Sequence, residues 1–138
     1  MILFASILLY VSSLFPDSIC IDDRCDSWPG YAILLMGWMA LLGSPANMTW
    51  GANLALFICW ALLANSRWIA ALVAGVLALT WGASLLLYSG VMSSESGGLS
   101  SITGTAIGYW LWLFSMVAAC CCAGYSIRMC ATTGDTPR

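Results

Sequence analysis

The sequence predicts an all-α membrane protein, built as one bundle of four transmembrane helices with an extra short interfacial or re-entrant helix at about residues 31–42. Two observations support this. Of the 138 residues, 62% are hydrophobic and only 7% are charged, whereas a soluble domain has about 25% charged residues. The four arginines and six acidic residues all lie outside four long apolar stretches. We therefore expect a single membrane domain over residues 1–138, with spans at about 1–16, 48–65, 68–89 and 105–125.

The four apolar stretches fit the thickness of a membrane to different degrees. A spanning helix needs about 20 mainly apolar residues, with a range of about 17–25. The stretches at 68–89 and 105–125 reach this length, and 48–65 lies at its lower limit. The first stretch is shorter, so a removed signal peptide is the alternative. It lacks a basic start and an A-x-A cleavage pattern, which favours an uncleaved first span.

Residues Tyr31–Leu42 are apolar but too short to cross a bilayer at about 1.5 Å per residue. Pro45 disfavours helix in the segment Gly43–Asn47, and Asn47 or Thr49 is expected to cap the helix that follows. We therefore expect Tyr31–Leu42 to lie at the outer interface, or to dip into the membrane and return.

The arginines predict the orientation. The positive-inside rule places basic residues that flank the spans in the cytoplasm. The acidic outer loops at 17–30 and 90–104 then face the other side, and both termini, with the tail at 126–138, are cytoplasmic. The predicted location is the cell (inner) membrane. The arginines that carry this argument are Arg67, Arg128 and Arg138.

Small residues recur at a spacing of four along the predicted spans, which places them on one side of each helix. Because lipid is as apolar as the helices, close backbone approach drives their association. Packing within the bundle is the favoured interpretation, and a seam for a dimer or a partner is the alternative. The predicted helix-packing residues are Gly51, Ala55, Ala70, Ala74, Ala78, Gly82, Gly104 and Gly108.

Asn53 is the polar residue that the sequence places within the second predicted span. An amide in hydrocarbon needs a hydrogen-bond partner. A bond to the backbone of the bent Gly43–Asn47 segment is the favoured interpretation, and a contact with a pore or a substrate is the alternative.

Several classes of chemistry lack the residues that they need. The chain has no histidine and no lysine, which removes the Ser-His-Asp triad, most zinc sites and a basic nucleic-acid surface. Ionisable residues that mark ion pathways are missing from the spans. We therefore predict a protein that is not an enzyme, uses no cofactor or metal and binds no nucleic acid.

Cys20 and Cys25 are predicted to form a disulfide in an oxidising compartment. Thiol redox chemistry is one alternative, although the spacing is C-x4-C rather than C-x-x-C. A metal site that adds Asp22 and Asp23 is another. The remaining cysteines of the last span and tail are read as packing residues, with S-acylation as the alternative; these are Cys120, Cys121, Cys122 and Cys130.

Two motifs stand out in the apolar part of the sequence. The first, GW-x-x-LLG…W-x-AN-x-x-L, consists of Gly37, Trp38, Leu41, Leu42, Gly43, Trp50, Ala52, Asn53 and Leu56. The second is GYWLWL-x-S at Gly108–Ser115. With these motifs the chain resembles small multi-pass bacterial inner-membrane proteins of unknown function. The resemblance implies a multi-pass inner-membrane location and no established activity, and it transfers no site residue.

These features favour a protein that acts through helix and loop contacts, as a subunit, a modulator or a toxin-immunity protein. Its expected partners are the lipid bilayer and either another membrane protein or further copies of itself. A channel or transporter component for an uncharged solute is the first alternative. A thiol-redox membrane protein that uses Cys20 and Cys25 is the second.

Overall fold

The structure is a computed structural model that describes residues 2–25, 28–39, 41, 44–92 and 99–133, apart from the side chains of 92, 99 and 133. It is mostly helical and includes one small sheet. The helices are α1 (Ile2–Ser13), α2 (Gly30–Met36), α3 (Pro45–Met48), η1 (Thr49–Gly51), α4 (Ala52–Ala64), α5 (Trp68–Ala83), η2 (Ser84–Leu87) and α6 (Ile107–Thr133), and the strands are β1 (Ile19–Ile21), β2 (Gly90–Met92) and β3 (Leu99–Thr105).

Three of the described helices are long and apolar enough to cross a membrane. They cover Pro45–Ala64, Trp68–Leu87 and Ile107–Thr132, in good agreement with the last three predicted spans. The first predicted span, at 1–16, corresponds to α1, which has only 12 residues. This length is below the range of about 17–25 residues that a span needs.

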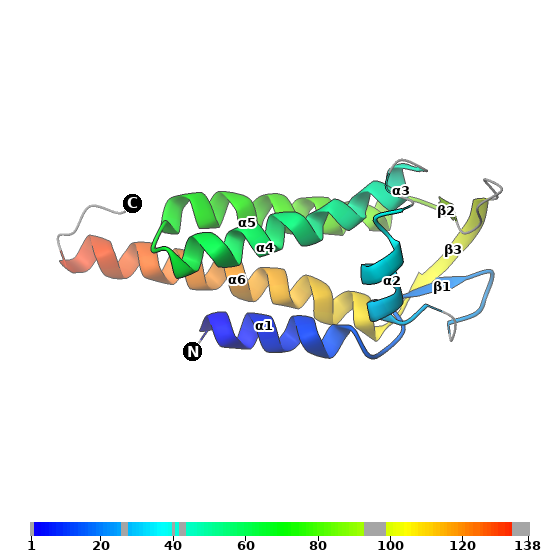
Figure 1. Cartoon of the computed structure of the whole chain (residues 1–138), viewed down its shortest axis with the longest axis horizontal. Coiled ribbons are helices and arrows are strands. Elements are labelled where there is room, and N and C mark those ends of the chain that lie inside the picture. The colour runs from blue at the N-terminus through cyan, green and yellow to red at the C-terminus, as the bar shows by residue number, and fades with distance from the viewer. Residues whose placement is uncertain (1, 26–27, 40, 42–43, 93–98, 134–138) are drawn as a thin grey trace.

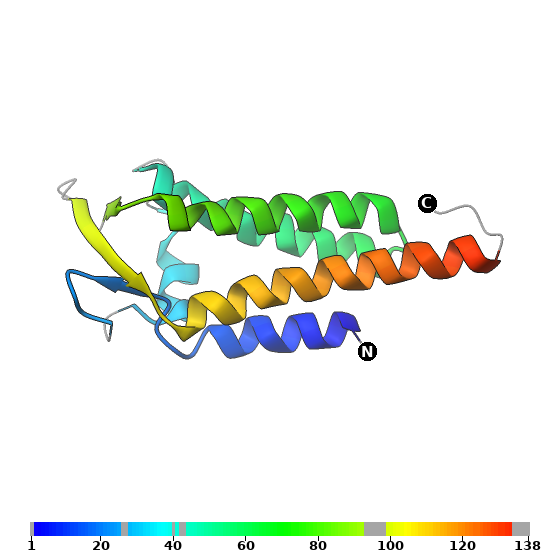
Figure 2. The ribbon, with the colours of Figure 1, turned by 180° about the vertical axis from the view of Figure 1, so that it is seen from behind.

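The long helices lie side by side and the sheet projects from one end of them (Figure 1). α1 packs on α6, α6 on α5, and α5 on α4. Figure 2 shows that α1 runs along only the half of α6 that is nearer to the sheet. The core therefore contains four helices near the sheet and three at the other end.

The three-stranded antiparallel sheet has the order β1-β3-β2. Its strands lie in the segments 17–30 and 90–104, which were predicted to be loops, and β3 extends one residue beyond the second, so the all-α prediction is incomplete. The strands bring these two segments together at one end of the bundle (Figure 1). Arg67, between α4 and α5, and Arg128, in the last turns of α6, belong to the opposite end.

The helix break near Pro45 differs from the prediction. Pro45 is the first helical residue and not the breaker, since a helix needs no N–H from its first residue. Ser44 is the cap, and its Oγ accepts a hydrogen bond from the backbone N–H of Asn47 at 3.3 Å. The expected caps Asn47 and Thr49 lie inside the turns that follow, which run into α4 without interruption.

α2 is shorter than the predicted helix at 31–42 and lies across the end of the bundle, beside the sheet (Figure 1). The indole N–H of Trp50 donates to the backbone oxygen of Leu34 at 3.1 Å. Gly37 lies directly against the ring of Trp50, where a side chain would collide with it. These contacts hold α2 on the start of the long helix Pro45–Ala64. Residues 40, 42 and 43 of the predicted helix lie outside the described part of the chain.

The seam of α5 is rotated relative to the predicted one. Ala70, which was expected to pack, is exposed, while Ala71, Gly75, Ala78 and Gly82 are buried. A turn has 3.6 residues, so a strict spacing of four drifts around the helix, whereas alternating steps of four and three stay on one side. The predicted seam therefore crosses the observed one near Ala78. Ala74 is half-buried at its margin, and so is Ala55 on α4.

Gly104 and Gly108 do not form a helix-packing pair, contrary to the prediction. Gly104 belongs to β3, where it lies opposite Cys20. Gly108 is in the first turn of α6, and its backbone N–H donates to the oxygen of Asp17 at 3.0 Å. A side chain at Gly108 would meet Ser18. The G-x-x-x-G spacing was misleading because β3 ends between the two glycines.

The predicted tail at 126–138 is also partly helical. α6 continues without a break to Thr133, and residues 134–138 lie outside the described part of the chain.

Candidate functional site

The segment Cys20–Cys25 forms a tight β-hairpin at the sheet end of the molecule. Ile21 and Arg24 exchange both backbone hydrogen bonds, each at 2.9 Å. Asp22 and Asp23 between them have φ values of 49° and 64°. Positive φ at both central residues is typical of a type I′ turn, the two-residue turn that fits the twist of a hairpin, and aspartate tolerates this conformation better than most residues.

A disulfide joins the next pair of residues along this hairpin. The sulfur atoms of Cys20 and Cys25 are 2.00 Å apart, as the sequence predicted for this pair. Four residues between two cysteines are the number that a two-residue turn and its hydrogen-bonded pair require. Because the two sulfurs bind one another, the alternative metal site with Asp22 and Asp23 has no thiolate ligands in this state.

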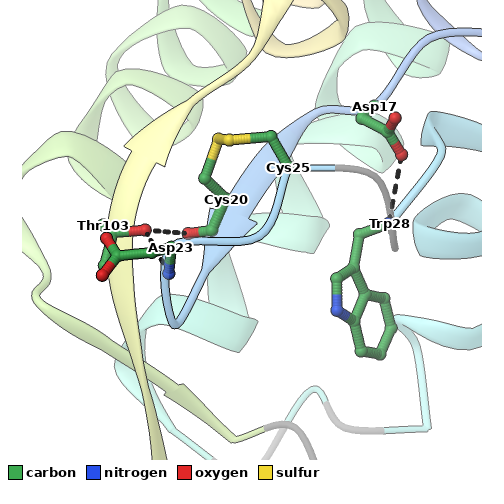
Figure 3. Close-up of a disulfide and its surroundings, with 6 residues drawn as sticks. All are labelled: Asp17, Cys20, Asp23, Cys25, Trp28 and Thr103. Atoms are coloured by element: carbon green, nitrogen blue, oxygen red, sulfur yellow. Dashed lines mark hydrogen bonds between the residues drawn. A yellow bond between two sulfur atoms is a disulfide. The ribbon is translucent and has the colours of Figure 1, made fainter.

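Thr103 joins the hairpin to the sheet through a β-bulge. Cys20 lies opposite Gly104 and Ile21 lies opposite Ile102, so Thr103 is the extra residue of β3. Its Oγ1 accepts a bond from the backbone N–H of Asp23 at 3.1 Å and donates to the oxygen of Cys20 at 3.4 Å (Figure 3). A bulge leaves backbone groups unpaired, and here the side chain of Thr103 supplies partners.

Two aspartates have structural roles, one within the turn and one before β1. Asp22 accepts a bond from the backbone N–H of Ser101 at 3.2 Å. Asp17 accepts one from the backbone N–H of Trp28 at 3.1 Å, which Figure 3 shows. The first bond ties the turn to β3, and the second closes the base of the segment. The exposed side chains of Asp23 and Arg24 remain at the tip. The hairpin is therefore a small, fixed surface that carries charges of both signs.

Asn53 lies inside the bundle and connects three helices. Its Oδ1 accepts bonds from the hydroxyl of Tyr10 at 3.1 Å and from the indole N–H of Trp112 at 2.9 Å. Its amide group donates to the oxygen of Trp50 at 3.0 Å. The predicted bond to the Gly43–Asn47 backbone is not the one formed. Asn53 is 6% exposed, and its acceptor is used by α1 and α6.

A second set of hydrogen bonds joins α1, α4 and α6 nearer to the N-terminus of α1. The indole N–H of Trp60 donates to the hydroxyl of Ser6 at 3.0 Å, and this hydroxyl donates to the oxygen of Ser115 at 2.7 Å. Tyr10 also packs edge-on against the rings of Phe57 and Trp60. Aromatic side chains thus fill the space between α1 and α4. The sequence contains these residues, but nothing in their spacing indicates that they meet.

The cysteines outside the hairpin differ in how far they pack into the bundle. A side chain at Gly75 would approach the sulfur of Cys120 to 2.9 Å and that of Cys59 to 3.2 Å. α4, α5 and α6 therefore meet at one point where glycine leaves room for two thiols. Cys122 packs against the core and Cys121 is exposed. The five cysteines that are not in the hairpin disulfide all lie in α4 or α6.

A shallow hollow of about 400 Å³ lies on the outside of α4 and α5, and its lining includes Ala55, Thr80 and Ser84. The hydroxyl of Thr80 donates to the backbone oxygen of Val76 at 2.9 Å, and that of Ser84 donates to Trp81 at 2.7 Å. Both hydroxyls are thus bonded within their own helix and do not need water as a partner.

The arrangement defines a class of protein: a helical protein whose described part contains three membrane-length helices and a disulfide-closed hairpin at one end. No known protein family, curated protein or solved structure matches the chain.

Proposed function

We propose that this chain is a non-enzymatic, four-span protein of the bacterial inner membrane. It works through contacts of its helices and outer loops, as a subunit, a modulator or a toxin-immunity protein. α1 is the fourth span in this proposal. Its polar residues Ser6 and Tyr10 are used inside the bundle, and it lies parallel to the axis of α6 (Figure 2).

The observation that carries the proposal is the contrast between the interior and the hairpin. Every buried side-chain nitrogen or oxygen of the described residues that is shielded from solvent has a hydrogen-bond partner. Asn53 uses its carbonyl oxygen twice within the bundle. The hairpin, in contrast, presents charged side chains outside the helices on a backbone that the disulfide and hydrogen bonds constrain. A disulfide, a bulge and two carboxylate bonds preorganise it, which reduces the entropy cost of binding a protein.

The channel alternative has less support from the same contacts. The polar side chains of the long helices that such a channel could use are Asn53, Thr80, Ser84 and Ser115. The carbonyl oxygen of Asn53 already accepts two hydrogen bonds, the hydroxyl of Ser115 donates to the oxygen of Trp112 at 2.6 Å, and the two remaining hydroxyls are bonded to α5 itself. A solute that used these polar groups would have to compete with their hydrogen bonds inside the protein.

Site-specific photo-crosslinking in native membranes tests the proposal. A photoreactive amino acid replaces Arg24 at the hairpin tip, and the matched control replaces Thr132, which is exposed at the other end of the molecule. We expect a discrete crosslinked protein from position 24 and none from position 132. The product should be lost when Cys20 and Cys25 are both replaced by serine.

Two results would contradict the proposal. One is the same crosslinked product from positions 24 and 132, which would indicate proximity without recognition. The other is a product at position 24 whose yield does not change in the Cys20→Ser, Cys25→Ser protein.

A further inference from the structure

α2 and the turn after it expose a large apolar surface beside the sheet. Leu34 on the inner face packs against the core, whereas the opposite face is uncovered. Among its members, Leu35 is 67% exposed and Met39 is 69% exposed. A helix that is apolar all round is normally covered all round, and contiguous exposed apolar patches mark interaction sites. The members of this surface, called the α2 face below, are Tyr31, Leu35, Met36, Trp38 and Met39.

The longest regular element near this surface indicates how far the membrane extends. α5 and η2 form a continuous helix of 20 residues, Trp68–Leu87. At 1.5 Å per residue it is about 30 Å long, the thickness of the hydrocarbon core. β2 begins at Gly90, three residues later. The boundary between hydrocarbon and water therefore falls between the end of η2 and the sheet.

α2 lies on the membrane side of that boundary. Figure 1 shows it across the bundle at the level where α5 and η2 end, with the sheet beyond it. The long helices also expose apolar side chains at this end of the bundle, with Leu87 84% and Ile107 64% exposed. The α2 face thus lies at the same level as apolar surface that the long helices present to lipid.

We infer that the α2 face is a lipid-binding surface that lies sideways in the leaflet on the sheet side, at the depth of the headgroups and upper acyl chains. Tyr31 and Trp38 suit this depth, since amphipathic aromatic rings prefer the interface. The sequence from Trp28 to Ser66 has no charged residue, so the α2 face offers no ion pair to a polar partner.

Backbone hydrogen bonds at the start of α2 also give this helix a mechanical role. The backbone N–H of Gly30 donates to Pro16 at 3.1 Å, and that of Tyr31 donates to Leu14 at 2.9 Å. These bonds connect the start of α2 to the end of α1, directly below the hairpin. A helix fixed in the leaflet would therefore hold the hairpin at a constant height above the membrane. This inference depends on the proposed membrane placement and not on the partner of the hairpin.

Spin-label accessibility in phosphatidylcholine vesicles tests the inference. Single cysteines replace Leu35, Met39, Val76 and Ser101, with the five cysteines outside the disulfide changed to alanine. Val76, exposed at the middle of α5, is the lipid control, and Ser101, exposed on β3, is the water control. Collision rates are measured with oxygen, which concentrates in the bilayer, and with a water-soluble nickel chelate.

At positions 35 and 39 we expect oxygen collisions to exceed nickel collisions several-fold, but by a smaller ratio than at position 76. At position 101 we expect nickel collisions to exceed oxygen collisions. If nickel collisions at position 35 match those at position 101 while position 76 is still lipid-like, the inference about the α2 face is overturned and the membrane placement is not. Few collisions with either reagent at position 35 would also overturn it, because protein would then cover the face. Free nickel access at position 76 would overturn the membrane placement as well.

The unsubstituted chain provides an independent check. Met36 and Met39 should react with a water-soluble peroxide several-fold more slowly in vesicles than free methionine does. Equal rates would contradict the inference without any substitution in α2.

Discussion

At the scale of single residues, Asn53 carries the polar contact on which three helices converge. Asn53→Leu keeps most of the volume but leaves the Tyr10 hydroxyl and the Trp112 indole N–H without their acceptor. We expect it to lower the free energy of unfolding by about 1–3 kcal/mol, the cost of unpaired buried groups. Denaturant titration in mixed micelles measures this. The control is Asn65→Ala on the exposed end of α4, for which we expect a change within about 0.5 kcal/mol; equal effects would contradict the role of Asn53.

Ser66 is a residue at which the backbone favours glycine. Its φ is 56°, its N–H donates to Leu63 at 3.2 Å, and the N–H of Arg67 donates to Leu62 at 2.9 Å. This is the Schellman pattern, whose left-handed position is usually glycine. Because a side chain there costs about 1–2 kcal/mol, we expect Ser66→Gly to raise the stability measured in the same titration.

The expected gain at Ser66 is partly offset by the greater freedom of glycine in the unfolded chain, so a rise of about 0.5–1 kcal/mol is the prediction. The control is Ser126→Gly within α6, which should lower stability by about 0.5–1 kcal/mol. A loss of similar size at both positions would show that the conformation of Ser66 carries no strain.

At the scale of elements, Gly75 determines how closely α4, α5 and α6 approach. Alanine normally stabilises a helix by about 1 kcal/mol relative to glycine. At Gly75 this gain should be outweighed, because the new methyl group would crowd the sulfurs of Cys59 and Cys120. We expect Gly75→Ala to destabilise the bundle, and Gly124→Ala, which has open space around it, to stabilise it. Restoration of stability in the Gly75→Ala, Cys120→Ala double variant would identify the crowding as the cause.

The elements also differ in how well the sequence predicts them. The helices at 52–64, 68–83 and 107–125 could be predicted, because an uninterrupted apolar run of this length has few other stable states in lipid. The sheet could not, since three-residue strands such as β1 and β2 are too short to show a period. The disulfide was predicted, but the two-residue turn that explains its C-x4-C spacing was missed. The two adjacent aspartates at the centre of that spacing could have indicated the turn, since aspartate tolerates positive φ.

The polar contacts illustrate a second limit of the sequence. Asn53 was identified as a residue that needs a partner, yet its partners Tyr10 and Trp112 are 43 and 59 residues away. Only the packing of α1 and α6 around α4 selects them among the polar and aromatic residues of the spans. Likewise, the phase of the α5 seam depends on neighbouring helices, so a list of small residues in α5 could not separate Ala70 from Ala71.

At the scale of the whole molecule, the two segments predicted to face outward form one sheet, and Arg67 belongs to the opposite end. This arrangement predicts that Ser101 and Ser66 lie on different sides of the membrane. Single cysteines at these exposed positions, in the background without the five free cysteines, report this with a membrane-impermeant maleimide. In right-side-out vesicles we expect labelling at position 101 and not at position 66, and in inside-out vesicles the reverse. Labelling of both positions from one side would contradict a single crossing by α5 and η2 between them. Labelling of position 66 alone from outside would reverse the orientation that the arginines predict.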